Sequence, residues 1–389
     1  MFPMKIRVLL LFCLISFQIT AAQTLSPTAE ISVLTIGQGG SLNDAFGHNG
    51  FRINDKAQDI DIVFDYGRFP FNEPGFYLNF ARGKLSYSIG VDSFKDVNNF
   101  YVWQNRTIKE QVLNLEQAEK QTLYNFLLNN YKPENRDYLY DFFYDNCATR
   151  IRDVANTALG DEITFNTPLD YKPQTFRTLI HNNLNKNSWG SLGIDIALGS
   201  VIDRTATPKE QMFLPENIHK FFNEAILADG QPLVSNSQSL YSKKEKKESS
   251  NLWLSPLVII GLITLGIGWI TYSDYKKNKR TRWLDATLFI ITGIIGVFLL
   301  LLWFATDHTA TAHNYNLLWA FALNLFMIRQ LRKPKPWFIK YLKFLLVMLC
   351  LLAFHWVVGV QVFAITLMPL IVALAIRYVF LVRYFQTNK

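Results

Sequence analysis

The segment Asp145-Asn146-Cys147-Ala148-Thr149-Arg150 decides how this chain is interpreted, because it carries the one cysteine of a long polar region. Of the other two cysteines, Cys13 lies in an apolar run near the N-terminus and Cys350 lies in an apolar run near the C-terminus. Neither is a plausible disulfide partner for Cys147. An unpaired cysteine in an exported domain is commonly reactive, and a buried structural thiol is the alternative.

The N-terminus indicates export. Lys5 and Arg7 precede an apolar run, which ends in the small residues Thr20-Ala21-Ala22. This pattern is typical of a cleaved secretory signal peptide. We therefore expect residues 1–22 to be removed, and Cys13 with them.

The composition changes sharply near residue 250. Residues 23–242 mix charged, aromatic and turn residues, as a soluble domain does, and residues 243–251 form a charged linker. Residues 252–389 are rich in large apolar side chains and hold seven of the nine tryptophans, which fits the aromatic belts of membrane proteins. The sequence predicts an α+β domain followed by an all-α membrane domain.

Five apolar stretches in the second half approach the roughly 20 residues that a helix needs to cross a bilayer. The third is short and contains Asn324. The predicted spans cover residues 252–272, 284–304, 315–330, 343–360 and 362–382.

Basic residues in the loops predict the orientation of these spans. Lysines and arginines cluster in residues 273–283 and 329–343, whereas residues 305–316 have none. The positive-inside rule places the two basic loops in the cytoplasm. We therefore expect an inner-membrane protein with a periplasmic N-terminal domain and a cytoplasmic C-terminus. Since much of the net charge of +8 lies in these loops, it does not indicate nucleic-acid binding.

Hydrophobic periodicity predicts the elements of the soluble domain. Asn114 and Gln117 resemble a capping box, and Thr207-Pro208-Lys209-Glu210 resembles another helix start. A helix that begins beside Cys147 would stabilise its thiolate through the helix dipole. The expected strands cover residues 31–36, 46–53, 61–66, 85–91 and 100–112, and the expected helices cover 115–130, 148–159 and 207–227.

A cysteine nucleophile needs a base and a group that orients this base. Among the histidines of the soluble half, His181 and His219 lie in polar or amphipathic stretches, which favours surface roles. His48 stands between Gly47 and Gly50 at the start of a strand, where small neighbours permit close approach. Asp61 and Asp65 alternate on the next strand, and either can be the orienting residue or a solvated carboxylate. We prefer Asp61.

A histidine strand that precedes a cysteine helix resembles the circularly permuted NlpC/P60 branch of papain-like thiol enzymes. The wider pattern resembles the Lnb family of bacterial lipoprotein N-acyltransferases. It comprises Gly47-His48, Asp65-Tyr66-Gly67-Arg68-Phe69, Gly83-Lys84-Leu85-Ser86-Tyr87, Asn135-Arg136, Tyr140-Asp141-Phe142, the segment around Cys147, His308 and Asn314-Tyr315-Asn316.

This resemblance implies transfer of a fatty acyl chain from a membrane phospholipid to the α-amine of a diacylated lipoprotein. Cys147 is then the nucleophile that carries the chain as a thioester, and His48 is its base. We expect a monomer, and no ligand cluster suggests a metal or another cofactor. The residues expected to contact substrate are Asn146, Asp65, Tyr66, His308 and Asn314.

Two other functions stay open. One is a membrane-anchored NlpC/P60-type cysteine peptidase or amidase that acts on cell-wall peptide, although a single span suffices for an anchor. The other is a non-catalytic envelope module with a buried Cys147, in which Cys147→Ser leaves function intact.

Overall fold

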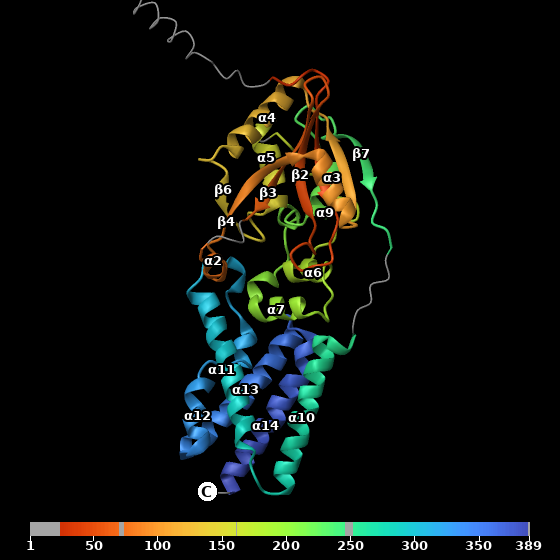
Figure 1. Cartoon of the computed structure of the whole chain (residues 1–389). Helices are drawn as coiled ribbons and strands as arrows, with labels where there is room; N and C mark the ends of the chain where they lie inside the picture. Colours follow the sequence, from red (N-terminus) through yellow and green to blue (C-terminus); the bar gives the residue numbers. More distant parts are fainter. Residues whose placement is uncertain (1–23, 70–73, 161, 246–251, 388–389) are drawn as a thin grey trace, which may run out of the picture.

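The computed structural model describes residues 24–69, 74–160, 162–245 and 252–387. An α+β domain stands on one end of a bundle of long helices (Figure 1). The predicted signal peptide and most of the predicted linker lie outside the described residues.

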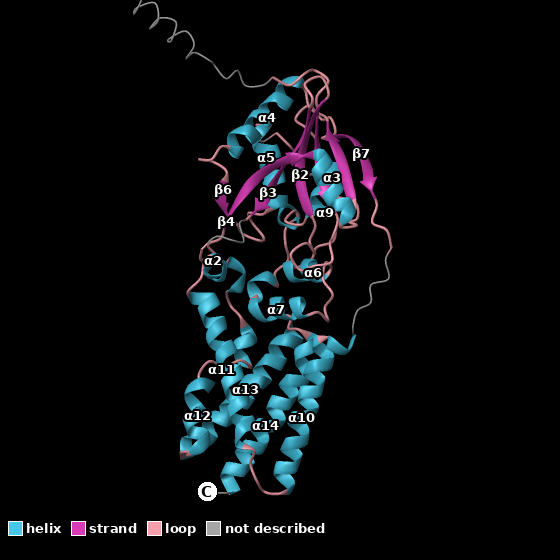
Figure 2. Cartoon of the chain, in the orientation of Figure 1, coloured by secondary structure: helices cyan, strands magenta, loops and turns pink. Residues whose placement is uncertain are grey.

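A seven-stranded antiparallel sheet forms the centre of the α+β domain (Figure 2), with the order β6-β4-β3-β2-β1-β5-β7. Along β2, Phe51 and Ile53 are buried in the core, and His48 and Gly50 belong to the opposite face because successive side chains alternate. The strands are β1 (Glu30–Ile36), β2 (His48–Asp55), β3 (Ile60–Arg68), β4 (Ser86–Ser93), β5 (Ile108–Leu113), β6 (Asp137–Leu139) and β7 (Val234–Tyr241).

Helices cover both faces of the sheet. On the core face, α4 (Gln117–Tyr131), α5 (Cys147–Ala158) and α9 (Pro215–Asn223) pack their apolar sides against the strands. On the other face, α3 (Phe94–Trp103) lies over β3, β4 and β5. The helix α5 contacts β2 and β3, and this packing brings its first residue, Cys147, to the strands that carry His48 and Asp65.

The structure corrects two predicted elements. The first four residues of the expected strand 100–112 belong to α3, which the side chain of Ser93 caps. Its Val97, Phe100 and Tyr101 follow helical spacing toward one face, which outweighs the strand preference of valine and aromatic residues. The expected helix 207–227 is two helices, α8 (Pro208–Gln211) and α9, because Pro215 begins a new helix.

Short helices join the sheet to the membrane helices. They are α2 (Phe76–Arg82), α6 (Phe176–His181), α7 (Trp189–Ala197) and η1 (Ser200–Ile202). The buried Arg177 ties α6 to the segment after it through Asp195 at 2.9 Å and Asp203 at 2.8 Å. From the membrane side, Asn314 donates hydrogen bonds to the carbonyls of Ile196 and Ala197. These contacts dock the two domains on each other.

Among the residues that the structure describes, four helices are long and apolar enough to cross a membrane. They are α10 (Pro256–Lys276), α11 (Arg282–Phe304), α13 (Pro336–Val358) and α14 (Met368–Thr387), the last of which is extended by the preceding turn from Ile365. The third predicted span differs, because residues 315–330 form the 3-10 turn η4 (Tyr315–Leu318) and the short helix α12 (Asn324–Arg332) with irregular backbone between them. This stretch still carries the chain from the docked end to the far end of the bundle (Figure 1).

Two glycines of α11 make room for this broken segment. A Cβ at Gly296 would lie 2.2 Å from the carbonyl oxygen of Ala320, and one at Gly293 would lie 2.6 Å from the Leu325 side chain. The buried Asn324 donates a hydrogen bond of 2.9 Å to Thr292 Oγ1 of α11. Irregular backbone at membrane depth is tolerated where protein surrounds it. Gly293 and Gly296, together called the glycine notch, let this backbone pack directly against α11.

An ionic cluster closes the far end of the bundle. Arg377 of α14 binds Asp274 of α10 at 2.8 Å and Asp285 of α11 at 2.7 Å, and all three side chains are buried. Charges inside a membrane protein are tolerated when they are paired in this way. The cluster therefore fixes α10, α11 and α14 against one another.

The glycine notch predicts a local stability effect. Gly296→Ala forces a methyl group into the backbone of Ala320, so we expect the free energy of unfolding to fall by about 1–3 kcal/mol. Gly268→Ala is the matched control, because its Cβ meets no atom within 4 Å. Thermal unfolding in detergent measures both variants, and equal melting temperatures would contradict the notch.

Candidate active site

Cys147 is the first residue of α5, and a capping box fixes this helix start. The Asn146 Oδ1 accepts hydrogen bonds of 2.9 Å from the backbone N–H groups of Ala148 and Thr149, while Thr149 Oγ1 accepts one of 2.8 Å from Asn146 N–H. The thiol therefore lies at the positive end of the helix dipole, which favours its ionised form.

The side chain of Asn146 is fully used by the fold. Its Nδ2 donates to the carbonyls of Phe142 at 2.7 Å and Phe213 at 2.8 Å, and the residue is only 4% exposed. With both ends of the amide occupied, Asn146 positions Cys147, and its contact with substrate stays a prediction.

His48 meets Cys147 beside Gly67. The antiparallel register of β2 and β3 pairs Gly50 with Asp65 and so directs His48 toward Gly67, next to an irregularity between Tyr66 and Arg68. A Cβ on Gly67 would lie 4.0 Å from His48 Cε1 and 3.9 Å from Cys147 Cβ. Gly67 also has a φ of +104°, which disfavours any residue with a side chain.

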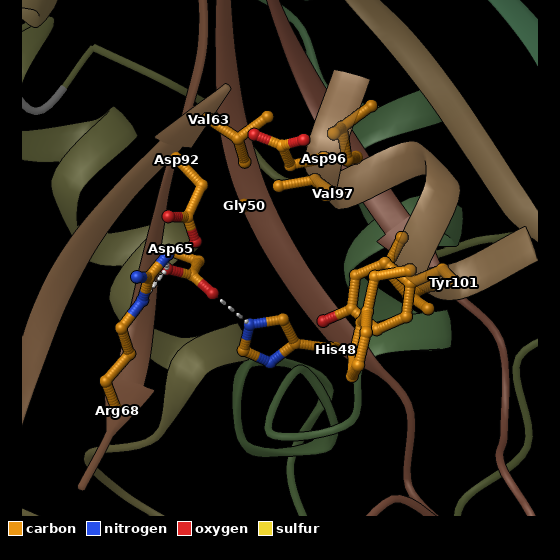
Figure 3. Close-up of a pocket in the computed structure, with 12 residues that line it drawn as sticks. His48, Gly50, Val63, Asp65, Arg68, Asp92, Asp96, Val97 and Tyr101 are labelled. Atoms are coloured by element: carbon orange, nitrogen blue, oxygen red, sulfur yellow. Dashed lines mark hydrogen bonds and ion pairs between the residues drawn. The ribbon is translucent and has the colours of Figure 1, made fainter. Parts of the chain in front are cut away.

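Asp65 orients the imidazole. His48 Nε2 lies 3.1 Å from Asp65 Oδ2 (Figure 3), and this contact leaves Nδ1 for the thiol. The second oxygen of Asp65 accepts a hydrogen bond of 2.6 Å from Arg68 Nε, so the carboxylate is held from both sides. The structure gives Asp65 this positioning contact, and its contact with substrate stays a prediction.

The structure does not bring Asp61 to His48. Asp61 pairs with Asn54, near the opposite end of the β2–β3 hairpin, and its side chain is 43% exposed. It binds Arg52 through two hydrogen bonds of 2.7 and 2.9 Å. The preference for Asp61 over Asp65 is therefore corrected. In an antiparallel hairpin the start of β2, with His48, lies beside the end of β3, with Asp65.

The environment favours an ion pair between His48 and Cys147. Burial alone lowers the pKa of His48, but Tyr101, the Cys147 thiolate and the hydrogen bond that His48 donates to Asp65 together raise it well above its ordinary value. Burial alone raises the pKa of Cys147, but the charge of His48 and hydrogen bonds from His48 and the Asn49 backbone lower it overall. A thiolate beside an imidazolium is the reactive form of a cysteine nucleophile.

One cavity has His48 in its wall, and a second cavity lies near it. The polar cavity, about 450 Å³, lies under α3, and its walls include His48, Asp65, Arg68, Asp92, Asp96 and Tyr101 (Figure 3). The apolar cavity, about 300 Å³, lies between the α+β domain and the membrane helices, and its walls include Phe46, Leu85, Tyr140, Phe142, Ile194 and Leu198.

The other predicted contact residues lie apart from the thiol. Tyr66 is 2% exposed, and its hydroxyl accepts a hydrogen bond from Asn130 in the core. Asn314 is 1% exposed and belongs to the domain dock. Both side chains are thus engaged within the protein, and their contact with substrate stays a prediction. His308 lines the apolar cavity, with its Nε2 3.0 Å from the Phe80 carbonyl oxygen.

Sequence reasoning gave no site role to Tyr101, which lines the polar cavity with His48, or to Tyr140, whose pKa is raised by burial and by the Cys147 thiolate. Tyr101 was hidden by the strand prediction for residues 100–112, whereas helical spacing from Val97 was a usable signal. Among the described residues, no group of three or more histidine, cysteine or acidic side chains is arranged to hold a metal.

The ion pair predicts an unusual pH dependence for Cys147. In a Cys350→Ala background, alkylation of Cys147 by iodoacetamide should have its midpoint below that of a free cysteine. In His48→Gln the charge is lost while burial remains, so the midpoint rises and the rate at pH 7 falls by on the order of tenfold. Site-resolved mass spectrometry measures the rates, and identical pH profiles would contradict the pairing.

Comparisons with known protein families agree with this architecture. The model of the Lnb N-terminal periplasmic domain matches residues 18–182, and the model of the Lnb transmembrane domain matches residues 246–389. No curated protein and no solved structure matches the chain. Since the two domains follow in this order and cover most of the sequence, the chain belongs to the Lnb family, which is named for lipoprotein N-acyltransferases, and it is a membrane protein with a periplasmic N-terminal domain.

Proposed function

We propose that this protein transfers a fatty acyl chain from a membrane phospholipid to the α-amine of the diacylglyceryl-cysteine of a lipoprotein, through a thioester on Cys147. The observation that carries the proposal is the Cys147–His48 pair, which Asp65 holds in place. The pair belongs to a domain that is docked on membrane helices. A peptidase for soluble cell-wall fragments has no need of such a docked bundle.

In the first step, the Cys147 thiolate attacks the ester carbonyl of the phospholipid. The S–C bond forms, the ester C–O bond breaks, and His48 gives its proton to the departing lysophospholipid oxygen. Asp65 keeps the imidazole in place and stabilises its charged form.

In the second step, the lipoprotein amine attacks the thioester. The N–C bond forms, the S–C bond breaks, and His48 takes the proton that the amine releases. The products are an amide on the lipoprotein and the regenerated ion pair. The sum is conversion of an ester and an amine into an amide and an alcohol, so the reaction needs no redox partner.

The tetrahedral intermediates of both steps carry an oxyanion. At the start of α5, the N–H groups of Ala148 and Thr149 are already bound to Asn146. The N–H of Cys147 has no partner inside its own helix, because the first helical residues lack one. We assign this N–H to the oxyanion, in agreement with the usual use of preorganised backbone donors.

The proposal includes a permuted NlpC/P60-like arrangement, since the histidine strand β2 precedes the cysteine helix α5. It also includes a monomer in the inner membrane with a cytoplasmic C-terminus. The basic loops at the far end of the bundle support this orientation.

The decisive test uses cells whose lipoproteins lack a third acyl chain. Mass spectrometry of a lipoprotein N-terminus should show an added acyl chain with the intact protein and none with Cys147→Ala. Immunodetection in membranes controls for expression. An equal chain count in both cells, with both proteins present, would sink the acyltransferase proposal and direct testing to cell-wall peptides.

The positioning role of Asp65 has a matched control in Asp61. Asp65→Asn weakens the orientation and charge of His48, so we expect kcat to fall by about 10²-fold or more and the alkaline limb of the pH profile to move downward. Asp61→Asn breaks only the pair with Arg52 on the far side of the hairpin and should retain activity. Equal losses of kcat in the two purified variants would show that Asp65 does not position His48.

A further inference from the structure

The apolar cavity lies between the two domains and has an inner end beside the reactive pair. Phe46, in its wall, is two residues before His48. The carbonyl of Phe142, another wall residue, accepts a hydrogen bond of 2.7 Å from Asn146, the residue before Cys147. One end of the cavity therefore lies near the reactive pair.

The mouth of the cavity is formed by α2 and by residues 307–311, which follow α11. The N–H of Asp307 donates a hydrogen bond of 2.9 Å to the carbonyl of Arg82, and a Cβ at Gly83 would lie 2.9 Å from His308 N. Segments far apart in sequence are thus joined closely here.

Apolar side chains surround this mouth. Leu78 and Phe80 of α2 are 61% and 57% exposed, and Phe304 at the end of α11 is 72% exposed. Phe304 ends a helix that is long and apolar enough to cross the bilayer. The mouth therefore opens at the level where a membrane surface meets the protein, and an alkyl chain can enter without crossing water.

Both carboxylates of the wall are already engaged. The carboxylate of Asp141 accepts hydrogen bonds from the Phe143 and Tyr144 backbone and from Thr309 Oγ1. Asp307 lies 3.5 Å from Lys84. With these carboxylates engaged, the remaining wall suits an apolar ligand.

We propose that the apolar cavity holds the fatty acyl chain carried on Cys147, and so selects the chain taken from the phospholipid donor; this inference rests on the proposed function. A volume of about 300 Å³ is at the small end of ligand pockets. The cavity accordingly holds the part of the chain next to the thioester, and the remainder extends through the mouth toward the bilayer. Each methylene that enters should raise donor affinity about fourfold until the cavity is full.

Two substitutions should shift chain selection in opposite directions. Leu198→Trp fills the cavity and should favour shorter chains, while Ile194→Ala enlarges it and should favour longer chains. Leu169→Trp, on a fully exposed turn, is the control for added bulk. None of these residues belongs to the catalytic pair.

The experiment uses the full-length protein in vesicles that contain equal amounts of phosphatidylglycerols with chains of 10, 12, 14, 16 and 18 carbons. Without acceptor, mass spectrometry determines which chain is esterified to Cys147. We expect the ratio of short to long chains to change at least threefold in each cavity variant and to stay unchanged in Leu169→Trp. Alkylation of Cys147 confirms that each variant is folded.

The other outcomes separate the two proposals. Thioesters with identical chain profiles in all variants would overturn the cavity inference and leave the acyltransferase intact. Identical chain profiles together with impaired transfer to a diacylated lipopeptide would assign the cavity to the acceptor. This outcome would also overturn the cavity inference. No acyl chain on Cys147 in any protein, including the unmodified one, would refute the proposed function itself.

Discussion

The side-chain amide of Asn146 is the interaction on which the candidate site depends. It donates to the carbonyl of Phe142 in the preceding loop and to the carbonyl of Phe213 before α9. It accepts from the N–H groups of Ala148 and Thr149 in α5. Three segments thus meet at one buried group beside Cys147. Leaving any of these partners unsatisfied costs about 1–3 kcal/mol, so the position of the thiol is coupled to the packing of the whole core.

A second constraint sets the relation of this site to the membrane. Asn314, Asn316 and Gln361 hydrogen-bond to carbonyls around α7, and Gly199 N–H donates to the Ala310 carbonyl. The buried ion pairs of Arg177 make the facing layer rigid. The sulfur is consequently held at a defined height above the bundle, and the apolar cavity occupies the space between them.

The features that local sequence determines were predictable, and those that depend on register were not. The start of α5 and the glycine-flanked His48 follow from capping and turn chemistry within a few residues. The choice between Asp61 and Asp65 required the pairing of β2 with β3, and the burial of Tyr66 and Asn314 required the tertiary packing around them. The broken form of the third predicted crossing was not predictable, because composition does not show that Gly293 and Gly296 admit an irregular backbone.

The domain dock also bears on how substrates arrive. Under the proposed function, a site held at one height over the bilayer would meet lipids and lipid-anchored proteins by lateral diffusion in two dimensions. Its rate then depends on the mole fraction of each substrate in the membrane, so adding inert lipid slows the reaction even when the amount of substrate per volume is constant. Because the hydrogen bonds of Asn314 help to fix this height, they help to make the reaction rate depend on the composition of the membrane.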